Sequence, residues 1–450
     1  GNMNQQQLTI SGALGHGDGT TTFTVATKSS DSYDVFSPAE DDDDGYSRES
    51  FSLVGHQDLN KEWQVNWLAK YNQGESEYDN AYGGANESSF ENQQWQLSAN
   101  QNDGDWGQSF FVGQQQNESR TFGNGIAEKD GTFFQTTRLQ ASWLGGLQLN
   151  TQLSANFGFD LIDEEIDAST TYELNQIEIN QRNIKSAFTR VAYDNSSIIL
   201  DGALRYDDIE GIDSEATYNL SAGLRFAEDS LVSLSVGSGF KAPSFNDLYY
   251  PEGTYSYGNP DLVAETSNSI ELLVKSEFSD INTELSIYNT KIENLIEWQP
   301  DANFAYHPIN VNEAEIDGVE LSLSAEFIGL SHQIHLNYLD ARDSNTNEPL
   351  IRRAKQTASY QVSQNWEDLN LLASINYQGE REDAAFDPVT FAPIRVLLPS
   401  HTLVNVSASY QVTSDWSVAL KVNNLFDKDF VTNNNYVGQP AQYLLTVSYR

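Results

Sequence analysis

Apolar and polar residues alternate with a period of two along much of the chain. Over residues 218–226, apolar residues stand at every second position with mostly small or polar residues between them, and the alternation recurs at 231–236, 404–410 and 443–449. Successive side chains of a strand point to opposite faces, so this period indicates β-strands rather than helices. A soluble sandwich would bury the apolar face, whereas a wide barrel would turn it to lipid around a wet lumen. Single strands fit both folds.

The connections between the strands separate the two folds. Short links such as 16–19, 58–61 and 102–105 alternate with longer acidic or Tyr/Asn-rich stretches. The long stretches lie roughly at 31–50, 74–89, 116–131, 162–180, 207–216, 239–266, 298–308, 341–351, 379–400 and 427–440. An up-and-down meander produces this alternation when all long loops lie at one end, as in outer-membrane barrels with short periplasmic turns. The sequence therefore predicts an all-β fold, a large antiparallel transmembrane β-barrel.

The predicted number of strands is odd. We count about 21 strands, and the chain is long enough for each to have the roughly 9–11 residues that a transmembrane strand needs. Single-chain bacterial barrels have even numbers. If the chain ends in the periplasm, its first and last strands both descend, and we expect one ascending strand to lie outside the sequence. A miscounted hairpin would also give an odd number. We expect residues 1–450 to form a single barrel domain of the 22-stranded type.

Composition narrows the range of functions. There are 24 Lys and Arg against 65 Asp and Glu, a net charge of −41, which repels phosphate and argues against nucleic acid as a partner. No apolar run reaches the roughly 18 residues of a membrane-spanning helix, although barrel strands need no such run. The chain has no Cys, and it has neither a Gly-x-Ser-x-Gly nor a His-Glu-x-x-His motif. We therefore do not expect an enzyme.

Three motifs resemble the signatures of one family. Residues 239–243 (GFKAP), 258–262 (GNPDL) and Glu265 resemble the mid-barrel signature of TonB-dependent outer-membrane transporters. Residues 312–320 (NEAEIDGVE) resemble the family's strand with a Gly-Val-Glu core, and 423–430 (NNLFDKDF) is similar to its penultimate hairpin. The resemblance implies a receptor in the outer membrane of a Gram-negative bacterium, a monomer surrounded by lipid and lipopolysaccharide, with TonB as the partner that energises uptake.

Further matches resemble the cobalamin transporters of this family. Residues 339–342 (LDAR) and 349–355 (PLIRRAK) resemble their late-barrel strands, and 32–35 (SYDV) followed by 42–46 (DDDGY) resembles their calcium-binding loop. Tyr78-Asp79 resembles the next loop that contributes to this site. The family's N-terminal plug domain, with its TonB box, has no counterpart in the sequence, and neither has a signal peptide. We expect energised transport to need a plug supplied separately.

The acidic loop is the first candidate for binding chemistry. Seven carboxylates stand close together at Asp31, Asp34 and residues 40–44, and without a cation such groups repel one another. Ca²⁺ takes six to eight oxygen ligands, but an EF-hand frame would put Phe51 where a bidentate Glu belongs. A second loop must therefore complete a calcium site. The ligands that the resemblance implies are Asp34, Asp42, Asp44 and Asp79. A solvated acidic surface loop is the alternative.

Aromatic residues in the long loops are the second candidate. They are Tyr78, Tyr82, Tyr249, Tyr250, Tyr255, Tyr257, Phe304 and Tyr306. Large amphipathic rings give contact area at a low cost in entropy, and in a cobalamin transporter such loops would cover a large, rigid ligand. An aromatic girdle at the membrane surface is the alternative. Among these residues, Tyr78 is the one that we expect to bind substrate.

Taken with the resemblance, these residues predict a barrel for cobalamin uptake. Loops ordered by Ca²⁺ would capture the ligand, a plug would close the lumen, and TonB would move the plug to release the ligand inward. Two alternatives stay open: a siderophore receptor of the same family, whose loops need no calcium, and a passive porin-like channel. The cations Arg352, Arg353 and Lys355 have two interpretations, either as partners of lipopolysaccharide phosphates or as partners of the acidic loops.

Overall fold

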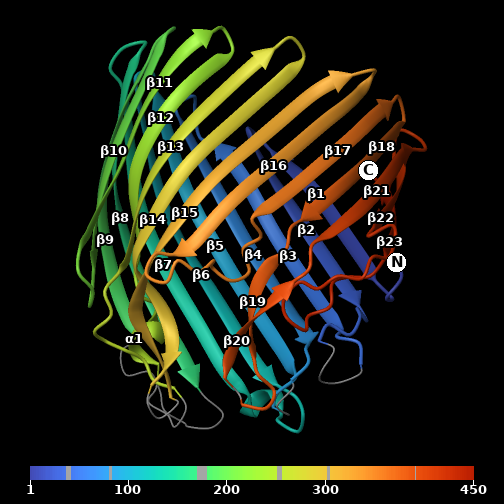
Figure 1. Ribbon diagram of the computed structural model, residues 1–450. Helices are drawn as coiled ribbons and strands as arrows, with labels where there is room; N and C mark the ends of the chain where they lie inside the picture. The colour runs from blue at the N-terminus through green and yellow to red at the C-terminus, as the bar shows by residue number, and fades with distance from the viewer. Residues whose placement is uncertain (37–41, 81–83, 170–179, 251–255, 302–304, 391) are drawn as a thin grey trace.

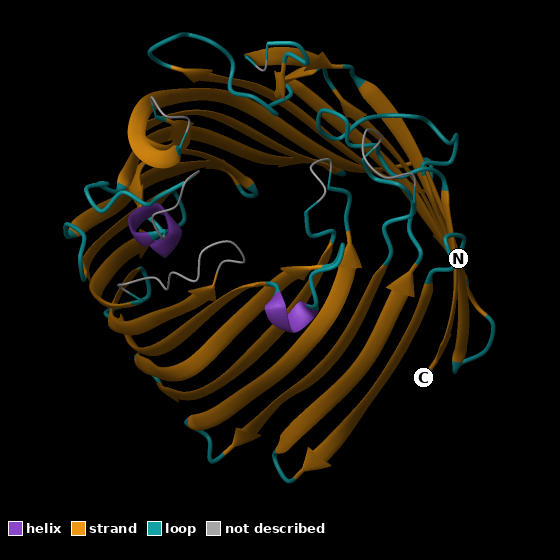
Figure 2. Ribbon diagram, turned by 90° about the horizontal axis from the view of Figure 1, so that it is seen from below, coloured by secondary structure: helices purple, strands orange, loops and turns teal. Residues whose placement is uncertain are grey.

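The strands of the protein wind into a tilted, ring-shaped wall. The computed structural model describes residues 1–36, 42–80, 84–169, 180–250, 256–301, 305–390 and 392–450. Short turns lie at the upper end of Figure 1 and the long connections at the lower end. Seen from the lower end, the strands surround a lumen (Figure 2). The long-loop end is the one that the sequence assigns to the cell surface.

The elements follow one another as strands with two short helical turns. The strands are β1 (Gln6–His16), β2 (Gly19–Ser30), β3 (Tyr46–Asp58), β4 (Trp63–Glu77), β5 (Glu87–Asp103), β6 (Trp106–Phe122), β7 (Thr132–Gln148), β8 (Leu153–Ser169), β9 (Gln181–Asp194), β10 (Ile198–Ile209), β11 (Glu215–Ala227), β12 (Ser230–Lys241), β13 (Glu265–Phe278), β14 (Ile281–Pro300), β15 (Tyr306–Phe327), β16 (Leu330–Asp343), β17 (Gln356–Trp366), β18 (Leu369–Gln378), β19 (Arg381–Phe386), β20 (Pro393–Leu398), β21 (His401–Gln411), β22 (Trp416–Asn423) and β23 (Gln442–Tyr449). The helical elements are η1 (Glu128–Asp130) and α1 (Phe245–Tyr249). Among the described residues, no helix is long and apolar enough to cross a membrane.

Antiparallel pairing of consecutive strands builds the wall. Strands β1 to β18 pair in chain order, β18 then pairs with β21, and the order continues to β23. This sheet has 21 strands, while β19 and β20 form a separate two-stranded sheet at the rim. The predicted fold class, a large antiparallel up-and-down barrel of about 21 strands, is confirmed.

The two faces of the wall differ as the alternation predicts. The register sets Leu220 beside Val236 and Leu234 beside Leu272 on the outer face. Large apolar side chains are exposed on this face all around the wall: Ile10, Phe51, Trp95, Leu97, Phe110, Leu139, Phe159, Leu204, Leu220, Leu234, Leu272 and Leu336. The intervening residues, such as Ser235, face the lumen. A continuous apolar outer band around a polar lumen is the pattern of a barrel that stands in lipid.

Several strands continue beyond their predicted ends. Strand β8 runs to Ser169 and β6 to Phe122, although the sequence predicts loops from about 162 and 116 onwards. The predicted loop at 379–400 holds the hairpin of β19 and β20. In the extension of β8 the outer face carries acidic residues such as Asp163 and Glu165 in place of apolar ones, while Ile166 on the inner face is buried. Alternation disappears there, and the sequence pattern therefore cannot mark where the strand ends.

Strands β1 and β23 are the two ends of the sheet and run in the same direction. In the described part of the chain, β1 forms a ladder with β2 alone, and β23 forms one with β22 alone. Met3 and Asn4 both have positive φ, 59° and 45°, as in the two-residue turns of hairpins. On the far side of this turn, Asn2 donates its N–H to Tyr443 O (3.3 Å). With 21 strands in its main sheet, the described part of the chain has the expected odd number.

Charge on the outer face should destabilise the barrel. Leu234→Arg places a cation in the apolar band beside Leu272, and the free energy of unfolding should fall by about 2–4 kcal/mol. Ser235→Arg is the matched control, because residue 235 faces the lumen and pairs across the ladder with Glu271. We expect the control to change stability by less than about 0.5 kcal/mol. Denaturant unfolding in lipid vesicles measures both variants, and equal losses would contradict the assigned faces.

Candidate functional site

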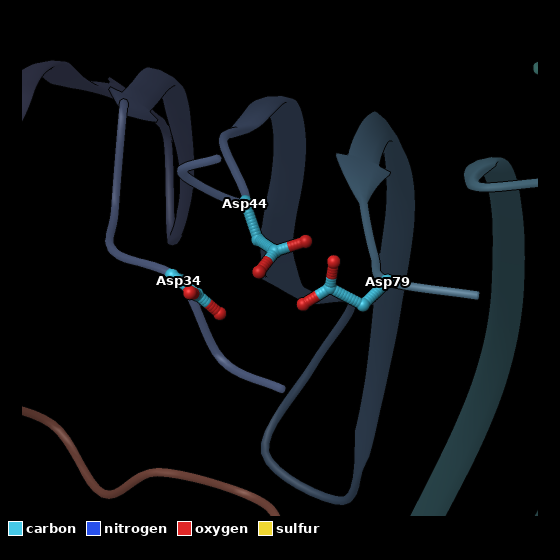
Figure 3. Close-up of side chains that lie close together, drawn as sticks. All are labelled: Asp34, Asp44 and Asp79. Carbon is cyan, nitrogen blue, oxygen red and sulfur yellow. The ribbon is translucent and has the colours of Figure 1, made fainter. Parts of the chain in front are cut away.

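Three aspartates from two loops meet at the rim of the barrel. Asp34 and Asp44 lie between β2 and β3, and Asp79 follows β4. One carboxylate oxygen from each lies within 4.8 Å of the others, and all three residues are partly buried. Figure 3 shows the three side chains gathered at one point between the two loops. The arrangement offers oxygen ligands at a spacing that a single cation can bridge.

Backbone N–H groups hold these carboxylates in place. Asp44 accepts a hydrogen bond from Val35 N (2.9 Å). Phe36 N donates to both Asp34 (3.1 Å) and Asp79 (3.1 Å) and therefore joins the two loops. Each of these bonds uses one of the lone pairs of a carboxylate, which leaves further oxygen lone pairs to face a cation.

The electrostatics of the cluster disfavour three free charges. Burial raises the pKa of Asp44 above its ordinary value, and the neighbouring charges of Asp79, Asp42 and Asp34 raise it further, against the lowering effect of the hydrogen bond from Val35. This is the response expected when carboxylates share a site without a compensating cation. A bound divalent cation would reverse it.

The predicted site residues differ in where the structure places them. Asp34, Asp44 and Asp79 are brought together, whereas Asp42 is exposed and outside the group. Tyr78 is partly buried directly before Asp79, and burial raises the pKa of its hydroxyl. The roles of these residues in binding stay predictions.

A third segment braces the acidic loop, which sequence reasoning missed. The rings of Phe36 and Tyr436 lie 4.8 Å apart, and the two residues form a β-bridge. Val437 N donates to Val35 O (3.0 Å). These residues come from opposite ends of the chain and meet because the barrel brings them together. No local pattern in the sequence signals such a contact.

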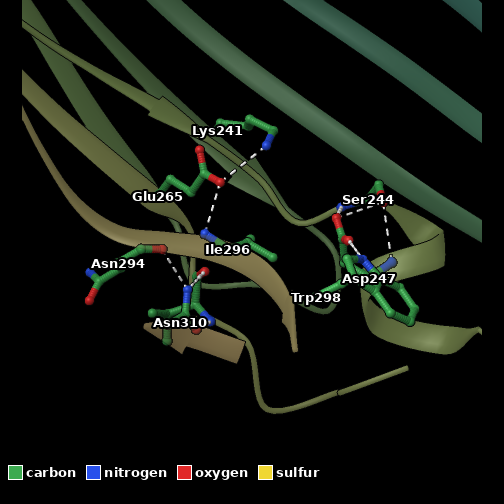
Figure 4. A network of polar contacts seen from close by, with 9 residues as sticks. Lys241, Ser244, Asp247, Glu265, Asn294, Ile296, Trp298 and Asn310 are labelled. Atoms are coloured by element: carbon green, nitrogen blue, oxygen red, sulfur yellow. Dashed lines mark hydrogen bonds and ion pairs between the residues drawn. The ribbon is translucent and has the colours of Figure 1, made fainter. Parts of the chain in front are cut away.

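The mid-barrel signature folds a segment back to the inner side of the wall, where Figure 2 shows helix α1. Figure 4 shows the polar contacts that fix this segment. Lys241 Nζ lies 3.1 Å from Glu265, which also accepts the backbone N–H of Ile296 (3.0 Å). Asp247 in α1 accepts a hydrogen bond from Trp298 Nε1 (3.0 Å). The signature residues therefore have a structural role in positioning α1.

Two glycines of the motifs allow close contacts. A Cβ on Gly258 would lie 2.5 Å from Tyr250 N, so only glycine lets the segment fold back on itself. A Cβ on Gly318 would lie 2.1 Å from the ring of Tyr288. The hydroxyl of Tyr288 donates to Glu320 (3.2 Å). The Gly-Val-Glu core thus provides both the space for this tyrosine and its hydrogen-bond partner.

Asn424 organises the third motif. Its side chain is 4% exposed and donates to the carbonyls of Lys428 (3.0 Å) and Gln439 (3.1 Å). Its backbone has a positive φ of 48°, which asparagine adopts more readily than most residues. The motif therefore anchors the long loop between β22 and β23, which carries Tyr436, the residue that packs on Phe36.

The loop aromatics gather near α1 where the structure describes them. Tyr250 packs edge-on against Trp298 (5.8 Å between ring centroids), and Tyr257 stacks on His307 (4.9 Å). Tyr249 packs against the buried pair Ile166 and Phe245. Tyr82, Tyr255 and Phe304 lie outside the described residues. Most of the described rings pack on neighbouring protein groups, so they shape the rim.

The cationic cluster near residue 352 pairs with acids. Arg352 Nε lies 2.7 Å from the fully buried Asp383, and Lys355 Nζ lies 3.1 Å from Asp340. Arg352 and Lys355 are therefore paired with acidic residues of β19 and β16, and the contact of this cluster with lipopolysaccharide phosphates stays a prediction. The pKa of Asp383 is lowered, because hydrogen bonds from Asn434 N, Arg352 and Ala384 N outweigh its burial.

A meander of antiparallel strands around a lumen, with long connections at one end and short turns at the other, is the architecture of an outer-membrane barrel. Residues 4–425 match the family model described as TonB dependent receptor-like, beta-barrel. The chain belongs to the TonB-dependent receptor β-barrel family. Members are receptors and transporters of the Gram-negative outer membrane, with TonB and a transported ligand as partners.

Curated relatives of this chain are named vitamin B12 transporter BtuB. The protein from Photobacterium profundum is 31% identical over 420 residues, which are 92% of this chain and 66% of the relative. The protein from Vibrio vulnificus is 28% identical over 438 residues, 95% of this chain and 69% of the relative. The chain thus spans about two thirds of the length of these relatives.

Solved structures with the same fold carry other names. The ferric enterobactin receptor PfeA from Pseudomonas aeruginosa has a TM-score of 0.83 at 15% identity, covering 99% of this chain and 77% of that one. The iron transporter FrpB from Neisseria meningitidis has a TM-score of 0.83 at 13% identity, covering 99% and 79%. At this identity the likeness concerns the fold.

Without divalent cations, the surroundings of Asp44 should gain stability as the pH falls from neutral. Because its folded pKa is raised, the carboxyl binds a proton more tightly in the folded chain than in the unfolded chain. Its contribution to stability is present below the ordinary pKa and is lost as the pH rises through the raised pKa. Hydrogen exchange at Val35 N–H in EDTA, corrected for intrinsic rates, should therefore slow at lower pH.

Two variants sharpen this measurement. Asp44→Asn keeps an acceptor for Val35 and should remove the pH dependence. Asp43→Asn removes an exposed neighbouring charge that lies outside the group of three, and it should leave the pH dependence in place. Protection of Val35 that does not change with pH in the unsubstituted chain would contradict the electrostatic account.

Proposed function

We propose that this chain is the barrel of an outer-membrane receptor for cobalamin, with Ca²⁺ held by Asp34, Asp44 and Asp79. The observation that carries the proposal is the meeting of these three carboxylates from two loops. The similarity to proteins named vitamin B12 transporters supports the choice of ligand. A plug and TonB would act as partners in uptake, with lipid and lipopolysaccharide around the wall.

The chemistry of the donor set fits calcium. Three carboxylates supply hard oxygen ligands, and backbone carbonyls and water can complete the six to eight that Ca²⁺ takes. A charge of +2 offsets most of the repulsion that raises the pKa of Asp44. Asp42 is exposed and lies outside this group of three, and we propose it as a fourth ligand that the resemblance implies and that a loop adjustment would bring to the ion.

Calcium would act by ordering the rim where ligand arrives. Phe36 N bonds two of the three aspartates, and Phe36 also packs on Tyr436. A cation that holds the carboxylates in place would therefore also order three loops: the one after β2, the one after β4 and the one before β23. Tyr78 directly precedes Asp79, so ordering of Asp79 positions this ring for contact with a large ligand.

Calorimetry with cyanocobalamin tests the proposal. We expect binding to detergent-solubilised protein to tighten when Ca²⁺ is added at millimolar concentration. Asp79→Asn keeps an acceptor for Phe36 but removes a charged ligand, and the gain from Ca²⁺ should fall about tenfold, which corresponds to roughly 1.4 kcal/mol. Asp43→Asn serves as the matched control and should behave as the unsubstituted chain.

The outcomes separate the alternatives. Binding of cyanocobalamin that is indifferent to Ca²⁺ would reject the metal site and keep the ligand. Binding of a ferric siderophore in place of cyanocobalamin, without effect of Ca²⁺, would favour the siderophore receptor. High conductance in planar bilayers with binding of neither would favour a passive channel.

A further inference from the structure

A cavity of about 400 Å³ lies between α1 and the inner side of the wall. Its floor is one row of side chains across four neighbouring strands, from β6 to β9. Ladder register aligns Gln115 with Arg138, Arg138 with Glu164, and Glu164 with Arg182. Residues paired across a ladder point to the same face. The strands end at the long-loop side, so the cavity opens near the side from which ligand arrives.

Helix α1 forms the other side of the cavity. Phe245 is 8% exposed and packs on Ile166, with Phe134 beside them. Arg182 stacks over the ring of Phe245 (4.9 Å) and donates to Pro243 O (2.9 Å). These contacts tie α1 to the wall and leave an apolar edge of rings next to the polar row.

The row carries more positive than negative charge. Glu164 accepts from Arg182 at 2.8 Å through one oxygen and from Arg138 at 2.8 Å through the other. Arg182 is used by Glu164, Pro243 and Phe245, and its side chain is 14% exposed. Arg138 is 45% exposed. Glu165 also borders the cavity, but it alternates to the opposite face of β8 and does not belong to the row. Two guanidinium groups therefore face one carboxylate, in a chain whose net charge is −41.

The exposed guanidinium fits an oxyanion. Arginine presents a planar fork of donors that matches phosphate and carboxylate oxygens. Gln115 and Asn117 line the same cavity and can add amide donors, while the partly buried Phe134 offers contact to a ring. The cavity is at the small end of ligand pockets, so it suits one end of a large molecule rather than the whole of it.

We propose that this cavity binds the phosphodiester-linked nucleotide of cobalamin, with Arg138 on the phosphate and Phe134 beside the base. The assignment rests on the proposed function and adds a subsite to it. Arg138 is a ligand-binding residue here, and Arg182 positions the row and α1. The corrin ring remains outside the cavity, towards the aromatic rim.

A comparison of two corrinoids tests the subsite. Cyanocobalamin carries the phosphodiester and the nucleotide, and cobinamide has the corrin ring without them. Arg138→Ala should weaken binding of cyanocobalamin about tenfold, as expected for the loss of a charge-assisted hydrogen bond, and should change binding of cobinamide less than about twofold. Arg138→Lys should keep part of the affinity, because it keeps the charge but lacks the fork.

The chain offers a matched control for folding and charge. Arg190 also faces the lumen, pairs with Asp201 at 2.6 Å and is 56% exposed, but it does not line the cavity. Arg190→Ala should leave both affinities unchanged. Arg138→Ala leaves Glu164 paired with Arg182, so the barrel should still fold, which the heat-dependent gel mobility of folded barrels checks.

Each result decides between the two proposals. Equal weakening of both corrinoids by Arg138→Ala, or no weakening of either, overturns the subsite while leaving the proposed function in place. Absence of binding of both corrinoids to the unsubstituted chain overturns the proposed function and the subsite with it. Weaker binding of cyanocobalamin with cobinamide unchanged supports both.

Discussion

The structure depends on one constraint: in lipid, every backbone N–H and C=O must find its partner within the protein. The meander meets this demand along the inner strands of the sheet by pairing each with two neighbours, while β1 and β23, at the two ends of the sheet, each have one ladder partner in the described part of the chain. Once the ladder registers are set, side chains alternate between lipid and lumen without further choice. The aligned row of Gln115, Arg138, Glu164 and Arg182 is a product of those registers, because it draws one residue from each of four strands.

Much of the wall could be predicted from the sequence, and the rim could not. Alternation around Leu220 and Leu234 identifies strands and faces, since one side of each meets lipid and the other meets water. Above the lipid, strands such as β8 lose that contrast, so their ends at residues like Ser169 escape a pattern-based reading. The hairpin of β19 and β20 lies at the same end of the barrel, where the sequence pattern predicts only a loop.

The candidate sites differ in the same way. The acidic residues of one loop stand out in the sequence, but the contribution of Asp79 came from resemblance, because its loop is separated from Asp34 by two strands. Asp42 belongs to the same acidic run yet lies outside the group that the fold assembles. The arginine surplus beside α1 has no sequence signature, since four distant residues meet only through the ladder. In a chain of net charge −41, the three aspartates concentrate negative charge at one point, and the row beside α1 has a local surplus of positive charge.

The fully buried Asp383 connects separate segments of the rim. It accepts hydrogen bonds from Arg352 (2.7 Å) and Asn434 N (2.7 Å), and so joins the outer hairpin to the segment that carries Tyr436. Tyr436 in turn packs on Phe36, whose N–H bonds the aspartates. Loops from both ends of the chain are thereby linked through direct contacts. The acidic cluster and the outer hairpin are therefore joined by a continuous series of hydrogen bonds and ring contacts, although they belong to segments far apart in the sequence.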